Sequence, residues 1–134
     1  MVEMDVVYEG KLHCNVTHGP SGNVISTDAP KDNQGLGQAF SPTDLLCASL
    51  GSCMMTIIGI YGQRHEIELA GATVHVTKEM ILEPVRRVGK ITLTFKLPNV
   101  PSAQRDALEK AAHSCPVIKS IHPDIQVISQ FVYA

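Results

Sequence analysis

The sequence predicts an α+β fold in the order βββ-α-ββ-α-α-β, with one domain spanning residues 1–134. Alternating apolar and polar segments, which are typical of strands, are grouped near the start, in the middle and at the end of the chain. One long apolar run, Leu45–Ile60, separates the first group from the second. An apolar fraction of 44% in 134 residues is enough for one packed core. This grouping favours α+β over a doubly wound parallel sheet.

Residues 3–18 alternate between apolar and polar, and the Gly-Lys pair at 10–11 predicts a turn between two strands. The candidate inward positions of these strands are Val6, Tyr8, Leu12, Cys14 and Val16. A dense turn signal at residues 18–23 precedes a short third strand at Val24–Thr27. Residues 28–40 are rich in Pro, Gly, Asp, Asn and Gln, so we expect an exposed loop long enough to carry function.

The long helix has a clear predicted start. Ser41 is a good N-cap, Pro42 suits the first helical position, and Asp44 completes a capping box with Asp in place of Glu. We expect the helix to run to about Tyr61 and to stop at Gly62. It has few polar residues on any side, and a single small sheet can cover only one face. The sequence therefore predicts that a second copy of the chain covers the rest.

The second half of the chain is expected to contain three strands, at residues 71–80, 90–97 and 126–133. Two helices are expected between the last two strands, at residues 103–113 and 116–121. The first two strands and the last alternate in the manner of half-buried strands. Ser102 is the expected N-cap of the first helix, and Pro116 the expected first residue of the second.

Composition excludes several classes of partner. The net charge is −2, and the chain has no Trp, three Phe and three Tyr, so it predicts no nucleic-acid partner. The N-terminus lacks a basic region followed by an apolar run, so we expect no signal peptide. The run Leu45–Ile60 is shorter than the roughly 20 residues of a membrane span. We therefore expect a cytoplasmic protein with no membrane partner.

The four cysteines are Cys14, Cys47, Cys53 and Cys115. None forms a C-x-x-C pair, and a reducing compartment argues against permanent structural disulfides. The six histidines are scattered without the i, i+4 spacing of helical metal ligands. The sequence thus predicts no cofactor and no metal centre, and a Cys/His metal site assembled from distant residues is the weakest alternative.

Two cysteines have neighbours that suggest chemistry. Cys53 follows Gly51 and Ser52 in the apolar helix, where small residues allow a substrate or another backbone to approach closely. Cys115 precedes Pro116 at an expected helix N-terminus, where backbone N–H groups stabilise a thiolate. A purely structural role competes with this interpretation, because free cysteines are among the most buried residues.

The other two cysteines are predicted to belong to the core. Cys47 lies about 240° around the helix from Cys53, so the two do not share a face. Cys14 lies in an alternating strand, where it is expected to point inward.

The stretch SPTDLLCASLGSC at residues 41–53, with HSCP at 113–116, resembles the OsmC/Ohr family of osmotically inducible and organic hydroperoxide resistance proteins. The similarity is to the shorter OsmC-like branch, and the order of elements extends it to nearly the whole chain. The resemblance implies an OsmC-like intertwined homodimer with central Cys-bearing helices. It also implies active sites at the dimer interface.

The same resemblance implies a two-cysteine, peroxiredoxin-like hydroperoxide reductase. Cys53 would be the peroxidatic thiol that becomes a sulfenic acid, and Cys115 the resolving thiol that forms a disulfide with it. The partners implied are a small-molecule organic hydroperoxide and a dithiol reductant of the lipoyl type. A thiolate, and not a thiol, cleaves the peroxide bond, so Cys53 needs a nearby cation or hydrogen-bond donor.

The groups that activate Cys53 are less easily assigned. Members of the family use an Arg from the N-terminal strands and a Glu early in the helix. Here no Arg precedes Arg64, and Thr43 occupies the Glu position of the hydroperoxide resistance branch. Asp44 matches the acidic residue of the shorter branch, although it is equally explained as a helix cap.

Lys11 and His113 are candidate sources of a positive field at Cys53, and Lys11 is the only Lys or Arg in the first thirty residues. The predicted catalytic residues are Cys53, Cys115, Asp44, Lys11 and His113.

The missing Arg keeps a second function open. The chain could be a non-catalytic, dimeric OsmC-like protein that binds a small apolar or thiol-containing ligand at its dimer interface.

Overall fold

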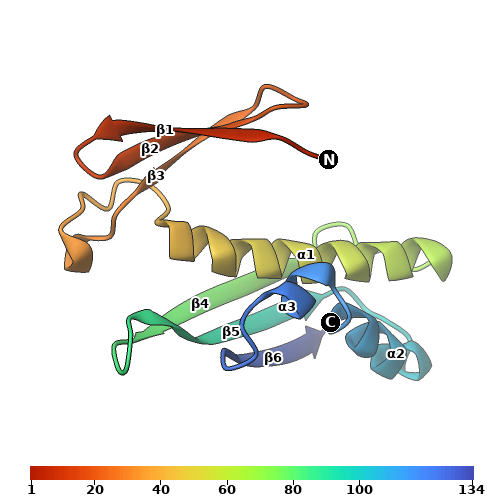
Figure 1. Ribbon diagram of the computed structural model, residues 1–134. Helices are drawn as coiled ribbons and strands as arrows, with labels where there is room; N and C mark the ends of the chain where they lie inside the picture. Colours follow the sequence, from red (N-terminus) through yellow and green to blue (C-terminus); the bar gives the residue numbers. More distant parts are fainter. The chain divides into compact units, whose positions relative to one another are not determined.

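The computed structural model describes residues 1–134 and confirms the predicted α+β order. The elements are β1 (Met4–Gly10), β2 (His13–His18), β3 (Val24–Asp28), η1 (Lys31–Asn33), α1 (Pro42–Arg64), β4 (Thr73–Ile81), β5 (Arg87–Leu97), α2 (Ser102–Ala112), α3 (Pro116–Ser120) and β6 (Gln126–Tyr133). The chain divides into two compact units, Met1–Leu46 and Cys47–Ala134. Each unit contains one three-stranded sheet (Figure 1).

The sheet of the first unit is an antiparallel meander, β1-β2-β3. Its register places Val6 opposite Val16 and Val16 opposite Ile25, so these side chains share one face. We call this the apolar sheet face, which comprises Met4, Val6, Tyr8, Cys14, Val16 and Ile25. Val6 and Tyr8 are each 63% exposed. The predicted apolar side therefore forms, but a single chain leaves much of it uncovered.

Two positions in this unit differ from their prediction. Cys14 is half-buried and does not belong to the core, because the apolar sheet face is largely open around it. Leu12 lies in the β1–β2 turn with φ 60° and is 45% exposed, so it is not an inward strand position.

The sheet of the second unit is mixed. β4 runs antiparallel to β5, whereas β6 runs parallel to it, so α2 and α3 form the crossover connection. Ile91, Leu93 and Phe95 of β5 are fully buried. α1 lies along this sheet (Figure 1), and a Cβ atom at Gly51 would lie 2.8 Å from Cγ2 of Val76. The core of the unit therefore lies between α1 and the sheet.

The capping box at the start of α1 is confirmed by two reciprocal hydrogen bonds. The Ser41 N–H donates to Oδ2 of Asp44 over 2.9 Å, and the Asp44 N–H donates to Oγ of Ser41 over 3.0 Å. The predicted end at Gly62 is wrong, because α1 continues to Arg64. Gly62 lies inside the last turns, where a Cβ would be 2.6 Å from Cδ1 of Leu69. The glycine therefore serves close packing and does not terminate the helix.

α2 also starts differently from its prediction. Pro101 is at the N-cap position and Ser102 is the first helical residue, with no side-chain capping bond. The Pro101 carbonyl instead accepts a hydrogen bond from the Gln104 N–H over 2.8 Å. The short helix α3 begins at Pro116 as predicted, and Cys115 is its N-cap.

α1 is long and apolar enough, by length and composition, to cross a membrane. It has 23 residues and a mean hydropathy of 1.7 over its most apolar window. The prediction considered only Leu45–Ile60, so its argument from length does not hold. Cys47, Leu50, Met54 and Ile58 form a buried row at i, i+3, i+7 and i+11. This buried row and the close packing of Gly51 on β4 and β5 are typical of the core helix of a globular protein.

Candidate thiol active site

The fold brings Cys53 and Cys115 together, although they are far apart in the sequence. Cys53 lies in α1, and Cys115 lies at the start of α3, in the crossover between β5 and β6. The two thiols lie close enough to interact, and this interaction raises the pKa of Cys115. Both cysteines are free, so the site is a dithiol that is available for oxidation to a disulfide.

Cys115 is fully buried, and burial is the largest cause of its raised pKa. The neighbouring Cys53 thiol raises it further, while the N–H groups of Ile118 and Val117 act in the opposite direction. The Ile118 N–H donates to Sγ of Cys115 over 3.4 Å. The expectation that the helix N-terminus makes Cys115 a thiolate is therefore wrong in its net direction, because α3 has only five residues and the thiol is desolvated. Cys115 keeps its proton at neutral pH and can donate it to the sulfur of Cys53.

Cys53 lies on a flank of α1, about 100° around the helix from the buried Met54. It is half-buried, whereas Cys47 is buried in the core as predicted. Gly51 does not provide space for a substrate beside Cys53, because Val76 and Leu93 occupy its open side. The small residue at this position allows α1 to approach the sheet.

His113 uses both ring nitrogens within the second unit. Nδ1 lies 2.7 Å from the Glu109 carbonyl, to which it must donate, and Nε2 lies 2.7 Å from Oγ of Ser129. The ring thus links α2 to β6. His113 is absent from the groups that shift the pKa of Cys115. Its role as a source of positive field for the thiols stays a prediction.

Asp44 and Lys11 belong to the first unit. The Asp44 carboxylate accepts the Ser41 N–H in the capping box, which accounts for the residue structurally. Lys11 is exposed in the β1–β2 turn, where it lines a cavity of about 300 Å³ together with Glu9, His13 and Asp28. A catalytic role for Asp44 or Lys11 stays a prediction.

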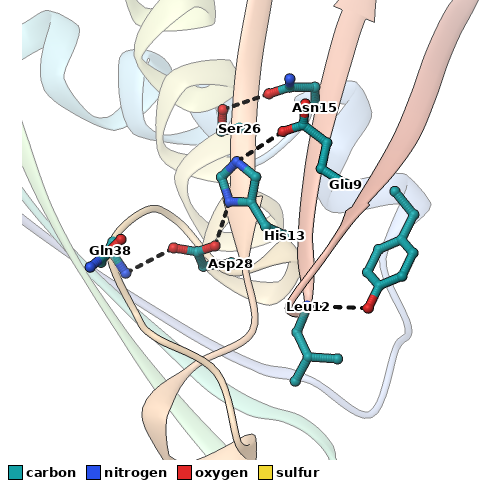
Figure 2. Close-up of polar contacts among 8 residues, drawn as sticks. Glu9, Leu12, His13, Asn15, Ser26, Asp28 and Gln38 are labelled. Carbon is teal, nitrogen blue, oxygen red and sulfur yellow. Dashed lines mark hydrogen bonds and ion pairs between the residues drawn. The ribbon is translucent and has the colours of Figure 1, made fainter.

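The first unit contains a polar cluster that was not predicted from the sequence (Figure 2). Nδ1 of His13 lies 2.5 Å from Oδ1 of Asp28, and its Nε2 lies 3.4 Å from Oε1 of Glu9. The Gln38 N–H donates to Oδ2 of Asp28 over 3.0 Å. Hydrogen bonding to His13 is the main reason why the pKa of Asp28 is lowered. The cluster fixes the loop after β3 to the sheet. No local motif marks it in the sequence, because residues 13 and 28 meet only through the β2–β3 register.

Comparison with known proteins gives one family and a set of similar structures. The model of a family described as OsmC-like protein matches residues 35–130. A Psychrobacter arcticus structure, described as a proposed osmotic stress induced and detoxification response protein, is 44% identical, with a TM-score of 0.90 and coverage of 100% of this chain and 96% of that one. No curated protein matched the chain in a sequence search.

Two further structures are similar in fold at low identity. An organic hydroperoxide resistance protein OsmC from Legionella pneumophila is 17% identical, with a TM-score of 0.79 and coverage of 98% and 96% of the two chains. An organic hydroperoxide resistance protein from Elizabethkingia anophelis is also 17% identical, with a TM-score of 0.80 and coverage of 100% and 96%.

Proposed function

Since this chain belongs to the OsmC-like family, we propose that it is a thiol-dependent peroxidase that reduces organic hydroperoxides. The observation that carries the proposal is that the fold places the Cys53 and Cys115 thiols close enough to interact. The names of the two hydroperoxide resistance proteins that share its fold support the same class of substrate.

The proposed reaction has three steps. The Cys53 thiolate attacks the terminal oxygen of the hydroperoxide, so that an S–O bond forms, the O–O bond breaks and the alkoxide leaves as an alcohol after taking a proton. The sulfur of Cys115 then attacks the Cys53 sulfenic acid, and the hydroxyl group leaves as water with the Cys115 proton. A dithiol reductant of the lipoyl type reduces the disulfide by two thiol–disulfide exchanges and is itself oxidised to a disulfide.

The environments of the two thiols suit these different roles. Cys53 is half-buried, so a small hydroperoxide can reach it, whereas Cys115 is fully buried and keeps its proton. Cys115 is therefore protected from direct oxidation. Because the two thiols lie close enough to interact, Cys115 is placed to attack a sulfenic acid at Cys53.

We further propose that two chains form an intertwined homodimer with central Cys-bearing helices. Residues 1–134 of each chain would form a single domain, and the dimer would be located in the cytoplasm. The apolar sheet face supports the dimer, because side chains such as Val6 and Tyr8 are more than half exposed in one chain. Asp44, Lys11 and His113 are the proposed activating residues, and the partner chain would complete the surroundings of each thiol pair.

The test is turnover of cumene hydroperoxide with dihydrolipoamide. The wild type should consume the hydroperoxide, and its intact mass should fall by the two hydrogens of one disulfide when the reductant is withheld. Cys53→Ser should reduce turnover to the level without protein. Cys115→Ser cannot form the disulfide, so its intact mass should rise by the one oxygen of a sulfenic acid when the reductant is withheld. Cys14→Ser, which changes a half-buried cysteine outside the pair, is the matched control and should retain activity.

A wild type that neither turns over hydroperoxide nor forms the Cys53–Cys115 disulfide would contradict the proposal. The alternative function would then be favoured, in which the dimer binds a small apolar or thiol-containing ligand without catalysis. The observation that motivates this alternative is the absence of any Arg before Arg64.

A further inference from the structure

Ser129 is an unusual residue for its position in β6. The other members of the inner row of this strand are Val127, Phe131 and Tyr133. These large side chains lie on the same face of the sheet as the buried row of β5, whereas Ser129 adds only a hydroxyl group to that face. The Ser129 hydroxyl oxygen lies 2.7 Å from Nε2 of His113, the C-cap residue of α2. The one small polar residue of this row is therefore the residue that holds the end of α2 to the sheet.

The imidazole ring of His113 is anchored from three directions. Nδ1 donates to the Glu109 carbonyl over 2.7 Å, so in a neutral ring Nε2 accepts a hydrogen bond from the Ser129 hydroxyl. In a protonated ring Nε2 donates to the same oxygen and the hydroxyl turns away, so the contact forms in both charge states. The ring also lies against Phe131, which stacks on Phe95 of the core. The anchorage of His113 therefore does not depend on its charge.

Only Ser114 separates the anchored ring from Cys115. The Ser114 N–H donates to the Ala111 carbonyl over 3.0 Å, and the Cys115 N–H also donates to a carbonyl of the last turn of α2. On the other side of the thiol, the Ile118 N–H donates to Sγ of Cys115 over 3.4 Å. Because the connection is short and hydrogen-bonded throughout, the position of the His113 ring helps to fix the position of the Cys115 sulfur.

The part of the sheet that holds His113 also supports α1. Ser129 pairs with Leu93 of β5 in the parallel register. A Cβ atom at Gly51 of α1 would lie 3.7 Å from Cδ2 of Leu93, so the helix packs on this residue at close range. Cys53 follows Gly51 by two residues, within the same turn of the helix. Adjacent residues of two paired strands thus support the helix that carries one thiol and the segment that carries the other.

We propose that Ser129 and His113 are positioning residues, which hold Cys115 where it can react with Cys53. The catalytic consequence rests on the proposed function: the sulfur of Cys115 attacks the Cys53 sulfenic acid, an S–S bond forms, and the hydroxyl group leaves as water with the Cys115 proton. Without the hydrogen bond to Ser129, Cys115 moves more freely in the reduced chain, and disulfide formation must remove that freedom. This role requires a contact and not a charge, so it differs from the positive field proposed for His113.

The first test measures the disulfide itself and needs no hydroperoxide. The full-length protein is equilibrated with lipoamide and dihydrolipoamide, so that its dithiol is oxidised to the disulfide as lipoamide is reduced. Alkylation of the remaining thiols and mass spectrometry then give the fraction of Cys53–Cys115 disulfide. Ser129→Ala leaves His113 and its charge in place. It should lower the equilibrium constant for disulfide formation by about 2- to 10-fold, as expected for one lost hydrogen bond, which raises the reduction potential by up to ~30 mV.

Three further variants separate the contact from other effects. Ser129→Thr keeps the hydroxyl group and should restore the equilibrium constant of the wild type. Ser102→Ala removes an exposed hydroxyl that makes no capping bond, and it should have no effect. His113→Asn keeps a donor for the Glu109 carbonyl but is too short to reach Ser129, so it should match Ser129→Ala. The double variant should be no worse than either single variant, because both changes break the same contact.

The second test follows the resolving step with one equivalent of cumene hydroperoxide and with dimedone, which traps a sulfenic acid. Ser129→Ala should give more dimedone adduct at Cys53 than the wild type, because Cys115 reacts more slowly. The rate at which the reduced variant consumes the hydroperoxide should stay that of the wild type, since the peroxidatic thiol is unchanged.

An equilibrium constant of Ser129→Ala equal to that of the wild type, or one of Ser129→Thr as low as that of Ser129→Ala, would overturn the inference. If the disulfide equilibrium depends on Ser129 but no hydroperoxide is consumed, the positioning role stands and the proposed peroxidase function fails. If hydroperoxide is turned over while the equilibrium is indifferent to Ser129, the peroxidase function stands and the positioning role fails.

Discussion

Cys115 is subject to three influences that act on its proton in different directions. Burial and the Cys53 thiol hold the proton on, whereas two backbone N–H groups at the start of α3 favour its loss. Burial dominates, so the pKa of Cys115 is raised from its ordinary value of 9.0. The folded state therefore holds this proton at a pH where the unfolded chain has begun to release it.

This difference predicts a loss of stability in alkali. The contribution of Cys115 to the free energy of unfolding is fully present below about pH 9. It is lost as the pH rises from 9 through the higher pKa that Cys115 has in the folded state. The free energy of unfolding should fall with pH in this window, and it should fall less steeply in Cys115→Ser, which cannot titrate there. Urea unfolding at intervals from pH 7 to pH 10.5 measures both slopes. Equal slopes for the two proteins would show that Cys115 does not contribute.

The sequence identified the two thiols but not their electrostatics. The motifs around Cys53 and Cys115 are local and can be recognised in the chain. The direction of the Cys115 pKa depends on how deeply the thiol is buried in the folded chain, which a local motif does not show. The pairing of His13 with Asp28 was missed for a related reason, because it depends on the register between two strands.

At the scale of the element, α1 combines a sheet-packed row with a flank that carries Cys53. Its two mid-helix glycines have different surroundings. A Cβ at Gly51 would lie 2.8 Å from Cγ2 of Val76, whereas a Cβ at Gly59 would meet nothing within 4 Å. The first glycine is required by close packing, and the second is not.

These glycines form a matched pair for mutation. Gly59→Ala should stabilise the protein by up to about 1 kcal/mol, because Ala is the better helix former. Gly51→Ala gains the same propensity but overpacks the core at a cost of roughly 1–3 kcal/mol, so it should be destabilising by about 1 kcal/mol. Thermal and urea unfolding of both variants provide the measurement. A stabilised Gly51→Ala variant would mean that the helix and sheet can separate without penalty.

The boundaries of the helices indicate which signals are local. The start of α1 was predicted correctly because the capping box involves only Ser41 and Asp44, three positions apart. Its end was not, because the contact that requires Gly62 comes from Leu69 after the chain has turned back. The residue type of Ser102 predicts a cap, whereas in the structure the Pro101 carbonyl accepts the hydrogen bond from the first turn.

At the scale of the whole molecule, the strand order and the α+β class followed from the grouping of alternating segments. The division into two units did not, because no change in composition marks residue 46. The first unit has an apolar sheet face on one side, while the other side mixes Val7 and Val24 with the polar residues Glu9, His13, Asn15 and Ser26. This asymmetry is the basis for expecting that a second chain covers only the apolar sheet face.

Val6 and Val7 provide a direct test of the dimer. They are 63% and 60% exposed and point to opposite faces of β1. Val6→Glu places a charge on the apolar sheet face and should weaken dimerisation by several kcal/mol, because an unpaired buried carboxylate is costly. Val7→Glu should leave the dimer intact. Sedimentation equilibrium of the two variants distinguishes these outcomes, and equal association by both would argue against this face as the interface.

The hydrogen bond from Ile118 to the sulfur of Cys115 links the redox state of the thiols to the backbone. When the Cys115 sulfur is bonded to Cys53 in a disulfide, its lone pairs point in new directions and it carries less negative charge. It therefore accepts the hydrogen bond from the Ile118 N–H less well. The first turn of α3, which has only five residues, would then open more often to solvent. The exchange rate of a single amide proton would thus record whether the molecule has met an oxidant, and it would return to its resting value once the thiols are restored.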